Sequence, residues 1–345
     1  MTRFLAITLL AGIAGCNRGT SSRVILPPDG IALDSTGAVE RRFVDEPLAL
    51  VAQAGGTEGD TTLMDPYIIA GDGNRVYVVE GDQLIQAYDT QARKLWTSGK
   101  TGSGPGEYRN IRDLKLAEHG EIWVHDPANA RITRLDSTGA IVGFIPTQFV
   151  GHSENMIPGP GTTAILLPPY ADADILTIDS AGRVVDRDTI PWRGFHELEH
   201  LSRQFETAND PATGRWTMGF TFGNGWLAFD QHGGSPRRYY VEPTQFPPVI
   251  KEVSNGGATV ASRLMRGELS GAGFALQGDT VFVLFGGKEL FRQKIDLYSW
   301  TTGKYLGTIA LPESVDNIAV AGTLLYTLSV TPYPKLAIYR RVGSR

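Results

Sequence analysis

Three copies of one seven-residue motif constrain the fold of this chain more than any other feature. They are Leu33–Val39 (LDSTGAV), Leu135–Ile141 (LDSTGAI) and Ile178–Val184 (IDSAGRV), and looser copies begin at Tyr88 and Leu297. Each copy is typical of a β-hairpin, because Asp and Ser start a turn by bonding their own backbone and Gly accepts the positive φ that the turn needs. The flanking apolar residues then end one strand and begin the next.

The copies are evenly spaced along the chain. The hairpin aspartates Asp89, Asp136 and Asp179 are 47 and 43 residues apart. Two glycine-rich segments, Gly55–Asp60 and Gly102–Glu107, precede the first two of these hairpins at the same interval of 47 residues. About four short β-patterned runs fall in each interval, and a period of about 45 residues with four strands is typical of one blade of a β-propeller.

Counting blades by their strands predicts an all-β, six-bladed propeller over residues 24–345. The blades are expected near residues 65–97, 112–146, 161–190, 216–250, 272–311 and 316–341. The last has three obvious strands, so we expect an N-terminal strand at residues 38–45 to complete it and remove an open edge. Seven blades, or two packed sheets, are the alternatives.

The amino end has the pattern of a secretory signal peptide over residues 1–15. Arg3 precedes an apolar run, Phe4–Ala14, that is shorter than the about 20 residues of a spanning helix. Ile13-Ala-Gly-Cys16 resembles the lipobox of bacterial lipoproteins, which implies cleavage before Cys16, lipid on that cysteine and a membrane tether. Residues 16–23 then form a linker. The alternative is a short signal peptide that contains a cysteine by chance.

Charge and cysteine content limit the chemistry of the mature chain. Residues 1–15 carry Arg3 as their one charged residue, so their removal changes the net charge from −5 to −6, which disfavours nucleic acid as a partner. Cys16 is the single cysteine, so the mature domain has no disulfide and no thiolate metal site. We expect a monomer in the cell envelope, lipid-anchored in the outer membrane of a bacterium.

Residues 102–145 carry a family resemblance. The G-x-G-P-G-E loop at Gly102–Glu107, the stretch Asp126–Arg131 with Asn129 and Arg131, and the LDSTG turn resemble the NHL-like six-bladed propellers of bacterial lipoproteins and secreted proteins. The resemblance implies the propeller fold and a role in binding. It also implies an alternative, because a minority of related propellers are metal-dependent lactonases or lyases.

One short motif suggests a metal. His196-Glu197-Leu-Glu-His200 fits the H-E-x-x-H pattern of zinc peptidases, in which both histidines bind zinc and the glutamate polarises the bound water. The segment Arg193–Asn209 has a helical apolar stripe that is centred nearly opposite His196 and His200, so the histidines would face water. We therefore expect a helical insertion near residues 193–210, with zinc binding there as the less favoured interpretation.

A second candidate metal site lies where inner strands begin. Asp65, Asp113, and Asp316 with Asn317, each precede an expected innermost strand, and in a propeller these positions ring one mouth of the central channel. Carboxylate and amide oxygens suit calcium. The alternative is that these residues stabilise local turns.

Glu107, Tyr108, Arg109 and Arg112 are expected to form a recognition rim at the same mouth. The glycine loop before them lacks a following helix, so it is no phosphate site. The favoured function is noncatalytic binding of a protein, peptide or glycan by the channel mouth together with the insertion that begins at residue 193. The alternative is a hydrolase of the lactonase type that depends on calcium or zinc.

Overall fold

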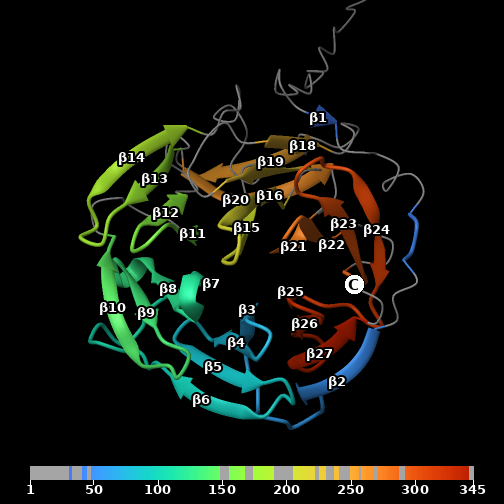
Figure 1. Ribbon diagram of the computed structural model, residues 1–345, viewed down its shortest axis with the longest axis horizontal. Helices are drawn as coiled ribbons and strands as arrows, with labels where there is room; N and C mark the ends of the chain where they lie inside the picture. Colours follow the sequence, from blue (N-terminus) through green and yellow to red (C-terminus); the bar gives the residue numbers. More distant parts are fainter. Residues whose placement is uncertain are drawn as a thin grey trace, which may run out of the picture.

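The computed structural model describes residues 31–32, 41–44, 48–147, 155–167, 174–189, 205–221, 225–230, 237–240, 249–255, 258–266, 271–286 and 292–341. Strands dominate the described residues. Six of the seven sheets in the described ranges are blades of antiparallel strands that radiate from a central axis, as Figure 1 shows. The prediction of a six-bladed β-propeller is confirmed.

The first three blades each contain four consecutive strands, with the first strand innermost. Blade 1 has β3 (Pro66–Gly71), β4 (Arg75–Glu80), β5 (Leu84–Asp89) and β6 (Lys94–Ser98). Blade 2 has β7 (Asp113–Leu116), β8 (Ile122–Asp126), β9 (Arg131–Leu135) and β10 (Ile141–Pro146), with 3₁₀ turns η1 (Glu118–Gly120) and η2 (Pro127–Asn129). Blade 3 has β11 (Asn155–Pro158), β12 (Ala164–Leu167), β13 (Asp174–Ile178) and β14 (Val184–Thr189).

The remaining blades follow the same plan. Blade 4 has β15 (Phe205–Asp210), β16 (Arg215–Phe220), β17 (Gly225–Phe229) and β18 (Arg237–Tyr240). Blade 5 has β21 (Gly271–Gln277), β22 (Thr280–Phe285), β23 (Lys294–Ser299) and β24 (Tyr305–Ala310). Blade 6 has β25 (Asn317–Ala321), β26 (Leu324–Ser329), β27 (Lys335–Arg341) and the N-terminal strand β2 (Leu48–Gly55).

The N-terminal strand that closes the ring lies later in the chain than predicted. It is Leu48–Gly55, antiparallel to β27 with Leu48 opposite Arg341, and not residues 38–45. Residues 41–44 run along the outer edge of blade 5 instead. The Arg41 guanidinium lies 3.0 Å from the Asp296 carboxylate, and the backbone of Arg42 and Val44 bonds Thr308 at 2.9 Å.

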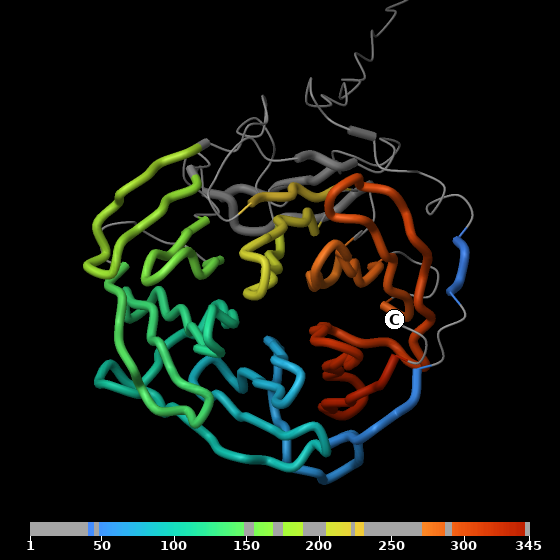
Figure 2. The backbone as a smooth tube through the Cα atoms, in the orientation of Figure 1, coloured from blue at the N-terminus to red at the C-terminus, as the bar shows by residue number. Residues whose placement is uncertain are grey.

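The N-terminal segment thus passes along three blades in turn. β1 (Ile31–Ala32) pairs in parallel with β18 of blade 4, residues 41–44 bond β24 of blade 5, and β2 completes blade 6. Figure 2 shows residues 41–44 as a blue tube outside blade 5. Three described pieces of the N-terminal segment therefore lie along two sheet edges and supply the last strand of a third sheet.

Two blade boundaries and one helix prediction need correction. Blade 3 begins at Asn155 rather than at residue 161, and blade 4 covers residues 205–240 rather than 216–250. Residues 205–210 form β15 and not the end of a helix, because Phe205 packs in a core cluster with Trp216 while Glu206 is exposed. Residues 193–204 of the predicted insertion lie outside the described residues.

An additional hairpin follows blade 4. Strands β19 (Val249–Asn255) and β20 (Ala258–Arg266) pair as a separate two-stranded sheet that the repeat pattern did not predict.

The repeated motif forms the outer hairpin of a blade and locks it to its neighbour. In blade 2, Asp136 accepts hydrogen bonds from the backbone of Thr138 and Ala140, and Gly139 has a φ of +84°. A Cβ at Gly139 would lie 3.0 Å from the ring of Trp96 in blade 1, whose indole nitrogen bonds Ser137 O. The motif is therefore a joint between blades as well as a turn. The copy at Leu33–Val39 lies outside the described residues.

Candidate functional site

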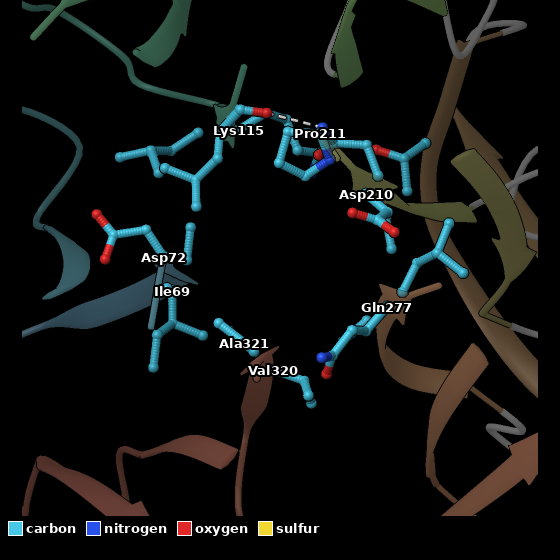
Figure 3. Close-up of a pocket in the computed structure, with 18 of the residues that line it drawn as sticks. Ile69, Asp72, Lys115, Asp210, Pro211, Gln277, Val320 and Ala321 are labelled. Carbon is cyan, nitrogen blue, oxygen red and sulfur yellow. Dashed lines mark hydrogen bonds between the residues drawn. The ribbon is translucent and has the colours of Figure 1, made fainter. Parts of the chain in front are cut away.

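The main cavity lies on the propeller axis. Its volume is about 660 Å³, and residues of all six innermost strands line it. Each innermost strand is an edge of its sheet, and an edge strand presents backbone N–H and C=O groups that no further strand takes up. The wall therefore offers donors and acceptors from the main chain in addition to the side chains, some of which Figure 3 draws.

Charge divides the cavity into two unlike halves. Among its described lining residues, Asp72 is the one charged side chain from blades 5, 6 and 1, which otherwise contribute mainly aliphatic and glycine residues. Figure 3 shows Ile69, Val320 and Ala321 on this side of the cavity. All other charged lining residues belong to blades 2 and 4: Arg112, Asp113, Lys115, Glu118, Glu206 and Asp210.

Asp113 and Lys115 form a nearly buried ion pair in the charged half. Their side chains are two residues apart on β7, so they share one face of the strand. The Lys115 ammonium lies 2.7 Å from Asp113 Oδ1, and the side chains are 13% and 5% exposed. Asp113 Oδ2 also accepts the backbone N–H of Met156 in blade 3 at 2.9 Å. Asp113 therefore holds the lysine and joins two blades.

Asp72 and Asp210 belong to the opposite end of the cavity, where innermost strands turn back. Asp72 accepts the backbone N–H groups of Asn74 and Arg75 and the hydroxyl of Tyr77. Asp210, which is buried, accepts the N–H of Ala212 within its own turn and that of Gly278 in blade 5 at 2.8 Å. Neutral donors thus hold both carboxylates in place.

The predicted recognition rim is mostly a structural unit. Glu107 closes the glycine loop by accepting Gly104 N–H at 2.7 Å, and this bond, followed by the Lys100 side chain, lowers the pKa of the Glu107 carboxyl. Tyr108 is fully buried between blades 1 and 2, and burial raises the pKa of its hydroxyl to about 12. Arg109 and Arg112 are exposed, and Arg112 lines the cavity.

The remaining motif residues of blade 2 hold that loop from the other side. Arg131 donates to the carbonyl oxygens of Ser103, Gly104 and Glu107 at 3.0, 2.7 and 2.6 Å. Asn129 donates to Gly102 O at 2.9 Å. The two ranges of the motif, Gly102–Glu107 and Asp126–Arg131, therefore form a clamp that fixes the chain where it crosses between blades. Hydrogen bonds within the protein explain these residues without a ligand.

Two carboxylates whose role sequence reasoning missed make matching contacts. Asp126, which ends β8, accepts the backbone N–H groups of Arg109 and Asn110, and Glu80, which ends β4, accepts those of Met64 and Asp65. Each carboxylate fixes the two amides that lead into an innermost strand. The signal in the sequence was an acidic residue at the end of the second strand of a blade.

The structure does not bring the predicted oxygen ligands together as a metal site. Asp65 is exposed, Asp113 is bound to Lys115, and Asp316 pairs with Arg292 and with Val330 N–H. Asn317 bonds the N–H of Ile318 and the carbonyl of Tyr67. No group of three or more His, Cys, Asp or Glu able to hold a metal ion occurs within the described ranges. The described donors do not fit calcium or zinc.

Two further predictions lie outside the described residues. They are the lipidation site Cys16 and the zinc motif with His196, Glu197 and His200. Within the part of the chain that the structure describes, no helix is long and apolar enough to cross a membrane.

Comparisons with known proteins add information on the fold. No family model matches the sequence, and no curated protein matches it. A solved structure of a protein named as exported, from Bacteroides fragilis, has a TM-score of 0.55 and 10% identity, with 87% of this chain and 98% of that chain covered.

Two further similar structures are of virginiamycin B lyase from Staphylococcus aureus. The selenomethionine-substituted lyase has a TM-score of 0.46 and 14% identity over 87% of this chain and 90% of that chain. The catalytically inactive lyase variant with quinupristin has a TM-score of 0.49 and 13% identity over 86% and 100%. At these identities the likeness concerns architecture, and the chain is a six-bladed β-propeller.

Proposed function

We propose that this chain is an extracytoplasmic binding protein, lipid-anchored at Cys16 in a bacterial outer membrane, whose central cavity holds a short peptide segment. The observation that carries the proposal is the two-sided cavity. Its apolar half, from blades 5, 6 and 1, suits aliphatic groups, and its charged half, from blades 2 and 4, suits polar ones. The ligand is therefore amphipathic.

The backbone lining favours a peptide over a glycan. A peptide can pair its own amides with the N–H and C=O groups of edge strands, the main-chain part of β-strand recognition. Sugars are commonly held against the exposed rings of Trp, Tyr or Phe, and the one such residue among the described lining residues is Phe274, which is buried. A charged ligand group would meet a net acidic wall, so basic side chains are expected in the peptide.

The alternative role as a calcium-dependent hydrolase at the channel mouth has less support, because the predicted ligands Asp113, Asp316 and Asn317 each bond another group of the protein. The zinc motif lies outside the described residues. Elemental analysis of the purified mature protein decides between the roles. We expect no stoichiometric calcium or zinc in a folded protein. One equivalent of either metal would favour the hydrolase.

The cavity proposal is tested with a phage-displayed library of linear dodecapeptides selected on the mature protein. Ala321 lines the cavity, so Ala321→Trp should fill part of it (Figure 3). Ala181→Trp is the matched control, because Ala181 is exposed on an outer hairpin turn. Selected peptides should bind the wild type and Ala181→Trp equally and Ala321→Trp at least about tenfold more weakly, which is about 1.4 kcal/mol. Equal binding to all three would place the site elsewhere.

The tether is tested separately. Cys16→Ser should release the protein from the membrane fraction while leaving peptide binding intact. Unchanged membrane partitioning of this variant would remove the lipid anchor from the proposal and leave the cavity part standing.

A further inference from the structure

A hydrogen bond crosses from blade 4 to blade 2 at the cavity. The side-chain amide of Asn209, on β15, donates to the carbonyl oxygen of Leu116, on β7, at 2.8 Å. Blade 3 lies between these two blades in ring order. Figure 3 draws a dashed line from the strand beside Lys115 to the strand beside Pro211. The bond therefore passes in front of the innermost strand of blade 3.

The cavity lining shows what this bond separates. Of β11, the innermost strand of blade 3, Asn155 alone lines the central cavity. Ile157, Pro158 and Gly159 instead line a separate recess of about 10 Å³, together with Asn209. Such a recess has room for about one water molecule. The Asn209 bond thus forms a partition between the two spaces.

The partition is held rigidly on the side of blade 4. Asn209 pairs with Trp216 in the β15–β16 register, and the Trp216 ring stacks on Phe229 with centroids 3.8 Å apart. The next residue, Asp210, is tied by its carboxylate to Gly278 N–H of blade 5. Because its neighbours are fixed, the Asn209 amide is preorganised toward Leu116 and loses little freedom by bonding there.

We propose that Asn209 is a specificity-determining residue, which sets the width of the charged half of the cavity and keeps a bound ligand off blade 3. The inference rests on the proposed function, since it concerns which ligands that cavity admits. A ligand then contacts the innermost strands of blades 1, 2, 4, 5 and 6, and it meets blade 3 at Asn155. The cavity therefore excludes ligands with side chains that would need the space next to Ile157.

The first test needs no ligand. Asn209→Asp keeps the size of the side chain but replaces the donor with an oxygen that repels the Leu116 carbonyl. Solvent paramagnetic broadening of Ile157 methyl resonances, with a nitroxide as the soluble probe, should rise at least threefold, because Ile157 is 2% exposed behind the partition. Ile85, fully buried between blades 1 and 2, should stay protected and reports that the fold is intact.

Two further variants complete this test. Asn155→Asp is the matched control, because Asn155 lines the same cavity and takes no part in the bond to Leu116; it should leave Ile157 protected. Asn209→Ala serves where the aspartate variant does not fold. Continued protection of Ile157 in a folded Asn209 variant would overturn the partition.

The second test concerns selectivity. Dodecapeptides selected on Asn209→Ala should carry bulkier side chains than those selected on the wild type, and they should bind the wild type at least tenfold more weakly. If Ile157 becomes accessible but the selected peptides bind both proteins equally, the assignment of specificity to Asn209 is wrong. If no peptide binds either protein, the proposed function fails while the methyl measurement still decides on the partition.

Discussion

The side-chain amide of Asn317, at the start of the last blade, donates a hydrogen bond of 3.1 Å to the carbonyl oxygen of Tyr67, at the start of the first. Asp113 makes the equivalent connection from blade 2 to Met156 of blade 3. The residues at these strand starts therefore join neighbouring blades, and the ring is closed on the inside by Asn317 as well as on the outside by β2.

Asn317→Asp should destabilise the ring. The substitution removes the donor to Tyr67 O and places a negative oxygen beside that carbonyl, so we expect a loss of about 1–3 kcal/mol in the free energy of unfolding. Urea denaturation checks this value. Asn74→Asp on an exposed turn is the control and should change it by less than about 0.5 kcal/mol. If both substitutions lower the free energy of unfolding equally, Asn317 has no role in closing the ring of blades.

Arg131→Lys should loosen the glycine loop of blade 2. Lysine cannot reproduce the fork with which arginine reaches the carbonyls of Ser103, Gly104 and Glu107. We expect a loss of about 1–3 kcal/mol in unfolding free energy and faster amide exchange at Gly104. Arg93→Lys, on an exposed hairpin with a local ion pair, is the comparison. A loop that exchanges as slowly as in the wild type would contradict the clamp.

Gly139→Ala should cost more stability than Gly120→Ala. Both glycines have positive φ, +84° and +76°, so both substitutions meet the same backbone penalty. A Cβ at Gly139 would also press on Trp96 at 3.0 Å, whereas none lies within 4 Å at Gly120. We expect Gly139→Ala to lower the free energy of unfolding by about 1 kcal/mol more than Gly120→Ala does, as measured by thermal unfolding. Equal losses would show that the hairpin does not lock the blades.

Acid should weaken the connection between Glu121 and Arg134. The Arg134 side-chain hydrogen bond lowers the pKa of Glu121 from its usual 4.5, against the opposing effect of burial. The folded state therefore binds this proton less readily than the unfolded state, so the stabilisation is complete above about pH 4.5 and is lost as the pH falls through the folded pKa.

Glu121→Gln gives the measurement for this prediction. The difference in unfolding free energy between wild type and Glu121→Gln should be larger at pH 7 than at pH 3. Glu58→Gln, at an exposed position, is the comparison variant. A difference that stays constant between the two pH values would contradict the assigned role of Glu121.

The sequence predicted the fold well because the fold is a repeat. Asp136 and Gly139 signal a hairpin through local backbone chemistry, and equal spacing of such hairpins leaves few architectures other than a propeller. The closing strand was misplaced because residues 38–45 and Leu48–Gly55 are both strand-like, and only contact with β27, far along the chain, distinguishes them. The predicted helix extended wrongly into β15, because Phe205 fits the apolar pattern of a helix as well as that of a strand. Its contact with Trp216, which decides between them, is not visible in the sequence.

The site was harder to predict than the fold. Of the predicted strand-start residues, Asp113 and Asn317 line the cavity, but Asp113 is bound to Lys115 and Met156. The predicted rim residue Tyr108 is a core residue. Both outcomes depend on contacts between blades, which a repeat does not encode. The division of the cavity between charged blades 2 and 4 and apolar blades 5, 6 and 1 likewise appears only when distant segments are assembled.

The most direct test of cavity binding is a titration of the methyl-labelled protein with a selected dodecapeptide, followed by NMR. We expect shifts at Ile69 and Val320, which line the cavity, and none at Ile85 and Ile122, which are fully buried elsewhere. Shifts confined to outer strands, with Ile69 and Val320 unchanged at saturation, would contradict the account.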